Sequence, residues 1–262
     1  NGTKLVIAQH GGGYGIGGPF VNENHEVKIC DKYFTWGWKS QEETEIVPMA
    51  AHKISDSKYN IKPDLKGTIL WVTNTWPIYF FRIDHVTSGL FGSEYFHWQK
   101  RFLKVVNSRV FEKLIIRLFN IDFGWNEEGR LAELDPTPKY YNRGTDSMLS
   151  QVKESRLCIH DYLGTAWLET LVINFPTVVF YDPSRVKTIE SAQPYLDDLR
   201  RVNILHDSPE SAAEFINKIH EDPMSWWMSS ELQQVRNKFC NQFARKSENW
   251  LEEWKEELLK MV

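Results

Sequence analysis

Residues 156–183, RLCIHDYLGTAWLETLVINFPTVVFYDP, predict two strands with a helix between them. Residues 156–160 are a short, largely apolar run, and residues 177–181 are β-branched and aromatic, as buried strands are. Residues 165–174 carry apolar side chains at helical spacing. A strand, a helix and a second strand in this order indicate two parallel strands that the helix connects.

The same alternation of strands and helices continues on both sides of this stretch. Because the strands are continuous apolar runs, we expect an α/β fold whose parallel sheet is covered by helices on both faces. Ligands of such sheets bind outside the carboxyl ends of the strands, so the residues after each strand are the candidates. Further strands are expected at residues 4–8, 33–38, 68–73, 113–119 and 203–205, and helices at residues 19–30, 95–107, 146–154, 192–200 and 208–221.

The chain divides into a sheet domain and a helical end. We expect residues 1–228 to form one α/β domain, with an irregular insertion near residues 120–145 that is a long loop or a lid. Residues 229–262 repeat apolar side chains at three- and four-residue steps, which predicts a long amphipathic helix or a broken pair. This end would pack on the domain or on a missing amino-terminal domain. A peripheral membrane contact is less favoured, because the polar face is rich in Glu.

Composition and charge narrow the class of protein. A net charge of −4 over 262 residues gives no broad attraction to nucleic acid, so no nucleic-acid partner is expected. The three cysteines are far apart and lack metal-ligand spacing, which argues against a disulfide framework and indicates a reducing, cytoplasmic setting. No apolar run reaches the length of a membrane span. The sequence does not begin with Met, so we expect it to be part of a longer chain.

A glycine-rich turn, QHGGGYGIGG at residues 9–18, directly follows the first predicted strand. Its six glycines in eight residues would let an anionic ligand approach the backbone N–H groups. A tight structural turn would explain one or two of these glycines, and the Gly-Lys-Ser/Thr of a P-loop is absent. We interpret the turn as part of a ligand site. The residues assigned to it are Gln9, Gly11, Gly12, Gly13 and Tyr14.

A second candidate site, HDYLGTAWLE at residues 160–169, lies where a strand ends and a helix begins. Backbone N–H groups at a helix start can hold a phosphate or a carboxylate. Glu169 follows Thr165 by four residues, so both side chains face one side of the helix, and a carboxylate there can accept two hydrogen bonds from a ribose diol. The alternative is capping by Asp161 or Thr165, with a surface Glu. The residues assigned to this site are His160, Asp161, Gly164, Thr165 and Glu169.

Two more strand ends carry polar side chains. Thr73 and Asn74 follow the strand at residues 68–73 and would present a hydroxyl and an amide to phosphate, or cap a helix. Asp182 and Arg185 follow the strand at residues 177–181, where a guanidinium could meet an anionic donor group. A plain turn with a surface Arg is the alternative there.

Four segments resemble the carboxyl-terminal half of a family of transferases encoded with O-antigen and other surface-carbohydrate genes. They are QHGGGYG (9–15), DKYFTWGW (31–38), HDYLGTAWLETLVINFPTVVFYDP (160–183) and NILHDSPESAAEFINKI (203–219). The family in turn is similar to GT-B glycosyltransferases, in which two Rossmann-like domains face each other across a cleft. The resemblance covers nearly the whole chain, and implies a Rossmann-like domain that binds a nucleotide-sugar donor.

The resemblance also implies roles for residues. Glu169 would bind the donor ribose, and Gly164 and Thr165 would lie beside the phosphates. His10 would line the cleft floor, and it is the best local candidate for acid–base catalysis, because imidazole titrates near neutral pH. No metal ion and no cofactor beyond the nucleotide-sugar substrate is expected, since GT-B enzymes stabilise the leaving phosphates with helix ends and basic groups.

The expected acceptor is a glycan or a lipid-linked glycan, at the inner face of the membrane. Two alternatives remain open at this point. One is transfer of an alditol phosphate from a CDP-alditol, as in teichoic-acid polymerases with a related donor fold. The other is a non-catalytic module that binds a nucleotide-sugar and recruits a partner through its carboxyl-terminal helix.

Overall fold

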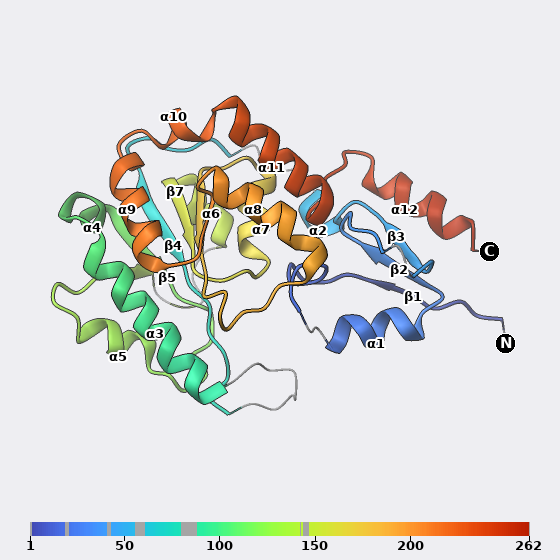
Figure 1. The fold of residues 1–262 in the computed structure, drawn as a ribbon, viewed down its shortest axis with the longest axis horizontal. Helices are drawn as coiled ribbons and strands as arrows, with labels where there is room; N and C mark the ends of the chain where they lie inside the picture. Colours follow the sequence, from blue (N-terminus) through green and yellow to red (C-terminus); the bar gives the residue numbers. More distant parts are fainter. Residues whose placement is uncertain are drawn as a thin grey trace.

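The strands of the computed structural model form two parallel sheets, a larger one of six strands and a smaller one of three (Figure 1). The structure describes residues 2–18, 21–40, 43–55, 61–79, 88–141, 143 and 147–261. The larger sheet has the order β6-β5-β4-β7-β8-β9. Counted from its first strand this order is 3-2-1-4-5-6, that of a Rossmann fold, which confirms the predicted fold class. Its strands are β4 (Thr68–Val72), β5 (Leu114–Arg117), β6 (Lys139–Tyr141), β7 (Ser155–His160), β8 (Thr177–Phe180) and β9 (Leu205–His206).

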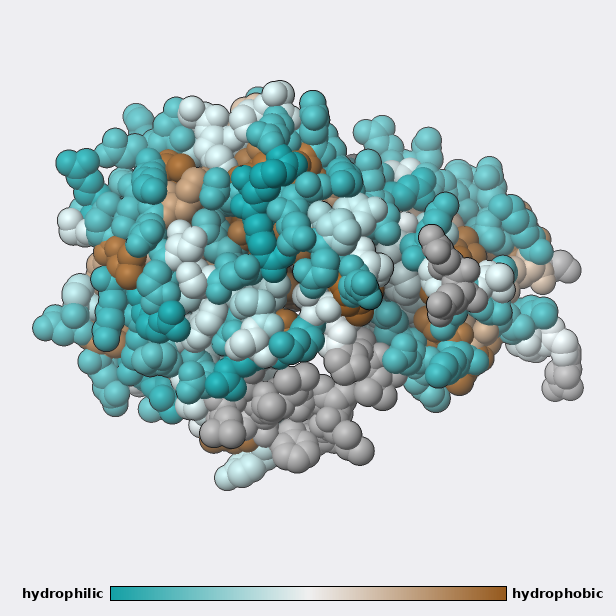
Figure 2. All heavy atoms as spheres, in the orientation of Figure 1, coloured by the Kyte–Doolittle hydropathy of each residue, from teal (hydrophilic) through white to brown (hydrophobic). Residues whose placement is uncertain are grey.

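Helices cover both faces of this sheet, as expected. Alternate side chains of its strands point to opposite faces, so Ile69 and Trp71 pack on one side and Leu70 on the other. The first face is covered by α3 (Ser88–Val105), α4 (Ser108–Lys113) and α9 (Pro209–Ile219). The second face is covered by α6 (Met148–Lys153), α7 (Ala166–Val172) and α8 (Gln193–Arg201). The short helix η1 (Glu190–Ala192) leads into the amino end of α8. The surface seen in Figure 2 is mostly hydrophilic, with apolar side chains scattered over it.

The smaller sheet corrects one expectation, because the strands predicted at residues 4–8 and 33–38 do not join the larger sheet. It consists of β1 (Val6–Ala8), β2 (Lys32–Thr35) and β3 (Ile46–Pro48), with β2 in the middle. An apolar run shows that a strand is buried and does not show which strand it pairs with. β3 was missed because it has only three residues. The helices α1 (Val21–Ile29) and α2 (His52–Ser55) belong to this end of the molecule (Figure 1).

The segment expected to be irregular, near residues 120–145, is partly regular. It contains α5 (Glu127–Ala132) and the edge strand β6. A turn precedes α5, in which the Asp122 carboxylate accepts the backbone N–H groups of Gly124 and Trp125. The strand was missed because it is an edge strand of only three residues, the first two of them exposed, and so lacks the continuous apolar signal of a central strand.

The carboxyl-terminal segment is the broken pair of helices, not the single long helix. It follows α10 (Pro223–Trp227) and consists of α11 (Ser230–Phe243) and α12 (Trp250–Leu259). α11 packs on the helices that cover the larger sheet, and its Arg236 donates to the backbone carbonyl of Leu171 in α7. α12 lies beside the smaller sheet, where Trp254 donates to the carbonyl of Ala50. No helix in the described part of the chain is long and apolar enough to cross a membrane.

Candidate functional site

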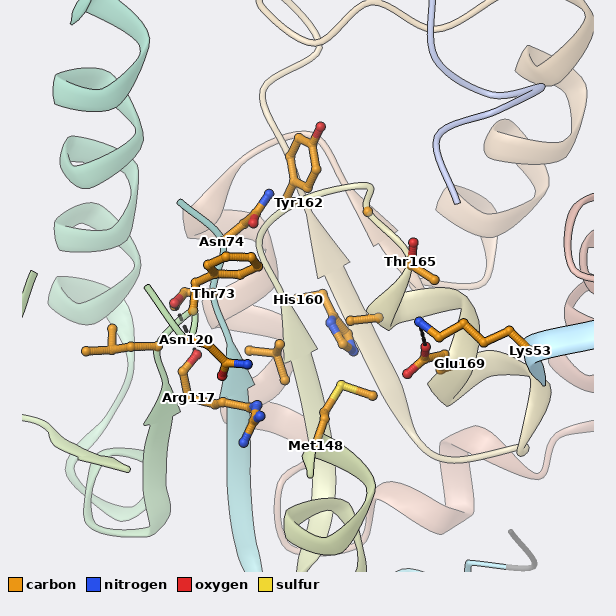
Figure 3. A pocket seen from close by; sticks show the side chains of 15 residues that line it. Lys53, Thr73, Asn74, Arg117, Asn120, Met148, His160, Tyr162, Thr165 and Glu169 are labelled. Atoms are coloured by element: carbon orange, nitrogen blue, oxygen red, sulfur yellow. Dashed lines mark hydrogen bonds and ion pairs between the residues drawn. The ribbon is translucent and has the colours of Figure 1, made fainter. Parts of the chain in front are cut away.

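A cavity of about 480 Å³ lies at the carboxyl ends of β4, β5 and β7 (Figure 3). The order of the sheet reverses between β4 and β7, and parallel sheets bind ligands at this point. The residues that line the cavity are Lys53, Val72, Thr73, Asn74, Arg117, Leu118, Phe119, Asn120, Met148, His160, Tyr162, Gly164, Thr165, Ala166 and Glu169.

Glu169 lies one turn into α7, and its carboxylate faces the cavity (Figure 3). Its Oε1 atom is 2.9 Å from Nζ of Lys53, which comes from α2 beside the smaller sheet. This ion pair links the two ends of the molecule and orients the carboxylate. Sequence reasoning missed Lys53, because nothing in the sequence near α2 indicates that the smaller sheet's end meets α7.

His160, the last residue of β7, contributes an uncharged ring to the cavity wall. The Thr170 hydroxyl donates to the carbonyl of Trp167, so the 3.1 Å contact between Nε2 and that hydroxyl oxygen requires His160 to donate. Burial lowers the pKa of His160 to about 3, because the interior disfavours the charged ring. His160 can therefore accept a hydrogen bond through Nδ1 and carries no positive charge at neutral pH.

The opposite wall of the cavity consists of the ends of β4 and β5. Thr73 donates both its backbone N–H and its hydroxyl to the carbonyl of Arg117, which fixes the two strand ends together. The backbone N–H of Asn74 donates to the Tyr95 hydroxyl at 2.8 Å. Arg117 donates to the Gln151 amide oxygen at 2.6 Å and brings a guanidinium to this wall. A strand end can turn its side chain to either face, so the sequence alone does not place Arg117 at this wall.

Asp161 follows His160 directly but is not among the residues that line this cavity. Its carboxylate accepts three hydrogen bonds, from Trp71 at 3.1 Å, Tyr95 at 2.7 Å and Gln99 at 3.0 Å. It is buried, and burial raises its pKa to about 7. These contacts tie β7 to β4 and α3, so Asp161 holds the scaffold beneath the cavity. Sequence reasoning could not foresee this, because the three donors lie 62 to 90 residues away.

Asp182 and Arg185, at the end of β8, also lie outside this cavity. Arg185 Nε is 3.6 Å from Asp182 Oδ2, and the other carboxylate oxygen accepts from the backbone and hydroxyl of Ser184. The ion pair and both hydrogen bonds therefore lie within a single turn of the chain, residues 182–185. A donor role for these two residues stays a prediction.

The glycine turn packs against the start of α7. The Gly12 N–H donates to the Thr165 hydroxyl at 3.0 Å, and a Cβ atom on Gly12 would lie 2.5 Å from the carbonyl oxygen of Gly164. Gly12 is therefore needed for close approach of two backbones, and its N–H is already used. Thr165 occupies the N-cap position of α7 but makes no side-chain cap bond.

Most of the turn's other groups have internal roles. Gln9 is fully buried, and its amide oxygen accepts from the Trp36 backbone and the Trp38 indole. Gly15 has a φ of +71°, and its N–H donates to Glu23. Gly11 lies beside the Tyr14 ring, and the Gly13 carbonyl accepts from two following N–H groups, those of residues 16 and 17.

His10 differs from its neighbours because 65% of its side chain is exposed, so a substrate can reach it. Its Nε2 atom lies 3.2 Å from Oε1 of Glu26 and 2.6 Å from the hydroxyl of Tyr14. Tyr14 itself is buried. An exposed imidazole held beside a carboxylate is an arrangement suited to proton transfer.

The described residues contain no group of three or more His, Cys, Asp or Glu side chains placed to hold a metal ion. The three cysteines, Cys30, Cys158 and Cys240, are buried free thiols. Burial raises the pKa of Cys158 above its usual value, as it does for an inert structural thiol.

Several solved structures are similar to this chain at low sequence identity. The wall teichoic acid polymerase TagF has a TM-score of 0.41 and 10% identity, over 92% of this chain and 58% of that one. The amino-terminal domain of Candida albicans trehalose-6-phosphate phosphatase has a TM-score of 0.48 and 14% identity, over 99% and 65%. WaaG, a glycosyltransferase involved in lipopolysaccharide biosynthesis, has a TM-score of 0.46 and 12% identity, over 96% and 61%. The chain thus spans 58% to 65% of the length of these structures.

No curated protein matches this sequence. A family model does match, and it covers residues 1–258, which is almost the entire chain. The chain therefore belongs to the LIC12162 family of transferases.

Proposed function

We propose that this transferase binds a nucleotide-activated sugar in the cavity at the carboxyl ends of β4, β5 and β7, and transfers the sugar to a surface glycan or a lipid-linked glycan. One observation carries the proposal. Six residues that the sequence indicated as donor ligands, from two separate segments, line the same cavity. They are Thr73, Asn74, His160, Gly164, Thr165 and Glu169.

The chemistry of the wall suits a nucleotide. Glu169 can accept two hydrogen bonds from the 2′- and 3′-hydroxyls of a ribose, and the Lys53 ammonium keeps its carboxylate directed into the cavity. Lys53 and Arg117 bring positive charge to the same space, which would stabilise the phosphates of the donor and of the departing nucleotide. The volume of about 480 Å³ lies within the range of ligand pockets.

The proposed base is His10, which belongs to the glycine turn whose Gly12 packs on Gly164 and Thr165. It would take the proton of the acceptor hydroxyl as that oxygen attacks the anomeric carbon. The sequence resemblance to GT-B glycosyltransferases supports this placement, since the two Rossmann-like domains of those enzymes face each other across the reacting groups. The acceptor would then meet His10 from the side of the smaller sheet, in the cytoplasm at the inner face of the membrane.

Calorimetric titration of the purified protein with UDP-, GDP-, dTDP-, CMP- and CDP-linked donors tests the proposal. We expect one nucleotide class to bind, and Glu169→Gln to weaken that binding about ten- to a hundred-fold, because a hydrogen bond to a charged group contributes about 1.5–3 kcal/mol. Glu221→Gln is the matched control: Glu221 is also paired with a cation, Arg109, on the exposed surface. Binding of none of the donors, or binding that Glu169→Gln leaves unchanged, would overturn the proposal.

The product distinguishes sugar transfer from transfer of an alditol phosphate. Sugar transfer makes a glycosidic bond, whereas alditol phosphate transfer makes a new phosphodiester. Phosphorus NMR of the acceptor product should show no new phosphodiester signal. Its appearance would replace glycosyl transfer with the phosphotransfer alternative and leave the donor site in place.

A further inference from the structure

The hydrogen-bond partners of His10 are unusual for an exposed histidine. Glu26, on α1, is only 19% exposed and lies with Oε1 3.2 Å from Nε2 of His10. The other oxygen, Oε2, accepts from the hydroxyl of Tyr33 at 3.1 Å. Tyr33 is a fully buried residue of β2. The carboxylate is therefore anchored from behind by a rigid strand and faces the imidazole in front.

The Tyr14 hydroxyl contacts the same ring nitrogen of His10 and fits either position of the ring proton. It lies 2.6 Å from Nε2 of His10 and 3.3 Å from Oε1 of Glu26. If Nε2 is protonated, it has acceptors in the carboxylate and the Tyr14 oxygen, and the tyrosine proton goes to Glu26. If Nε2 is unprotonated, it accepts the tyrosine proton, and the carboxylate then faces a ring nitrogen without a proton. The negative charge of Glu26 favours the first arrangement.

The Nδ1 atom is the other end of the same ring. Within the described part of the chain, no hydrogen bond reaches Nδ1, and the side chain is 65% exposed. Glu26 of α1 and Tyr14 of the turn bond to the ring, Tyr33 of β2 bonds to Glu26, and Glu23 of α1 interacts electrostatically with Glu26. Glu23 is occupied, because it accepts from the Gly15 N–H at 2.7 Å. Glu26 is thus the carboxylate that bonds to His10.

We infer that Glu26 is a positioning residue, anchored by Tyr33, which keeps the proton of His10 on Nε2 and so makes Nδ1 the basic nitrogen that faces the acceptor. The inference rests on the proposed function, since it names the atom that would act as base there. Nδ1 takes the hydroxyl proton while the oxygen forms its bond to the anomeric carbon. The bond from that carbon to the nucleotide phosphate breaks, and its electron pair leaves with the phosphate oxygen. Glu26 stabilises the imidazolium that results.

Nitrogen NMR of the histidine-labelled protein tests this without a substrate. The signals of His10 are assigned by their loss in His10→Asn. At a pH where the ring is neutral, we expect the chemical shifts of an Nε2–H tautomer. In Glu26→Gln the charge is gone, and in Tyr33→Phe the carboxylate loses its anchor, so both variants should shift the population towards Nδ1–H. Glu112→Gln, an exposed carboxyl elsewhere, is the control.

The outcomes separate this inference from the proposed function. A predominantly Nδ1–H ring in the unaltered protein would overturn the inference, and so would a tautomer that neither variant changes. Neither result depends on donor binding. If the tautomer behaves as expected and a donor binds, Glu26→Gln should lower kcat roughly a hundred-fold, with donor affinity nearly unchanged. Should the tautomer behave as expected while no donor binds, the His10–Glu26 pair stands and the proposed reaction fails.

Discussion

The cavity at the edge of the larger sheet and the glycine turn of the smaller sheet both lie where strands end and both carry polar groups, yet they use these groups differently. In the cavity, the side chains of Glu169 and Arg117 line an open space while each also bonds to a neighbouring side chain. In the turn, the amide of Gln9 and the N–H groups of Gly12 and Gly15 bond within the protein. Similar sequence signals therefore mark the wall of an open cavity in one place and a packing junction in the other.

The largest effect should come from a residue that belongs to the scaffold although it lies beside the cavity. Asp161→Ala removes the acceptor that the buried Trp71 and Tyr95 share with the half-buried Gln99. Each unsatisfied buried donor costs about 1–3 kcal/mol, so unfolding in urea should show a loss of about 3 kcal/mol or more. Asp197→Ala, at an exposed ion pair, is the control. An unchanged urea midpoint with lost donor binding would make Asp161 a ligand contact instead.

The pH dependence of stability tests the neutral state of His160. Its pKa is about 3 in the folded protein and near 6.5 when unfolded, so its contribution to stability is complete above pH 6.5 and is lost as the pH falls towards 3. Between pH 6 and pH 5, the free energy of unfolding of His160→Asn should fall less steeply than that of the unaltered protein, by about 1.4 kcal/mol per pH unit.

His206 provides an independent comparison, because burial lowers its pKa to about 4 at the end of β9, away from the cavity. The free energy of unfolding of His206→Asn should likewise fall less steeply between pH 6 and pH 5 than that of the unaltered protein. If His160→Asn leaves the slope unchanged while His206→Asn reduces it, the ring of His160 is charged or solvated, and the description of the cavity wall is wrong.

Gly12 tests the packing role of the turn. Gly12→Ala would place a Cβ atom 2.5 Å from the Gly164 carbonyl oxygen, and the two backbones would have to separate, at about 1–3 kcal/mol in the free energy of unfolding. Gly11→Ala is the matched control, since the nearest atom to its Cβ is the Tyr14 ring at 3.6 Å. Equal stability of the two variants would contradict the proposed junction.

The smallest effect on stability is expected at Lys53. Its ammonium is 57% exposed, and exposed ion pairs contribute about 0–1 kcal/mol, so Lys53→Gln should barely change the urea midpoint. Donor affinity should fall more than stability does, because Glu169 loses its orientation and the cavity loses a charge. Lys255→Gln, at an exposed helical pair on α12, controls for loss of a surface cation. An equal loss of affinity in both variants would remove Lys53 from the site.

The sequence predicted every strand of the larger sheet except β6, and the strand-to-helix junction at residues 160–169, because these signals are local. Continuous apolar strands identify a buried parallel sheet, and the chain order then dictates which loops share an edge. The approach of the smaller sheet's end to α7 was beyond prediction. Lys53 lies 116 positions before Glu169 in the sequence, and Thr165 lies 153 residues after Gly12. Such contacts depend on how two sheets pack, which no periodicity encodes.

The most direct test of the central claim is a map of donor binding over the backbone amides. Proton–nitrogen correlation spectra are recorded while the nucleotide class that binds is titrated into labelled protein. We expect the largest shift changes at residues 73–74, 117–120 and 164–169, with smaller ones at residues 11–15 through the Gly12–Thr165 contact. Shift changes concentrated in the glycine turn, with the amides around Glu169 unmoved, would contradict the account.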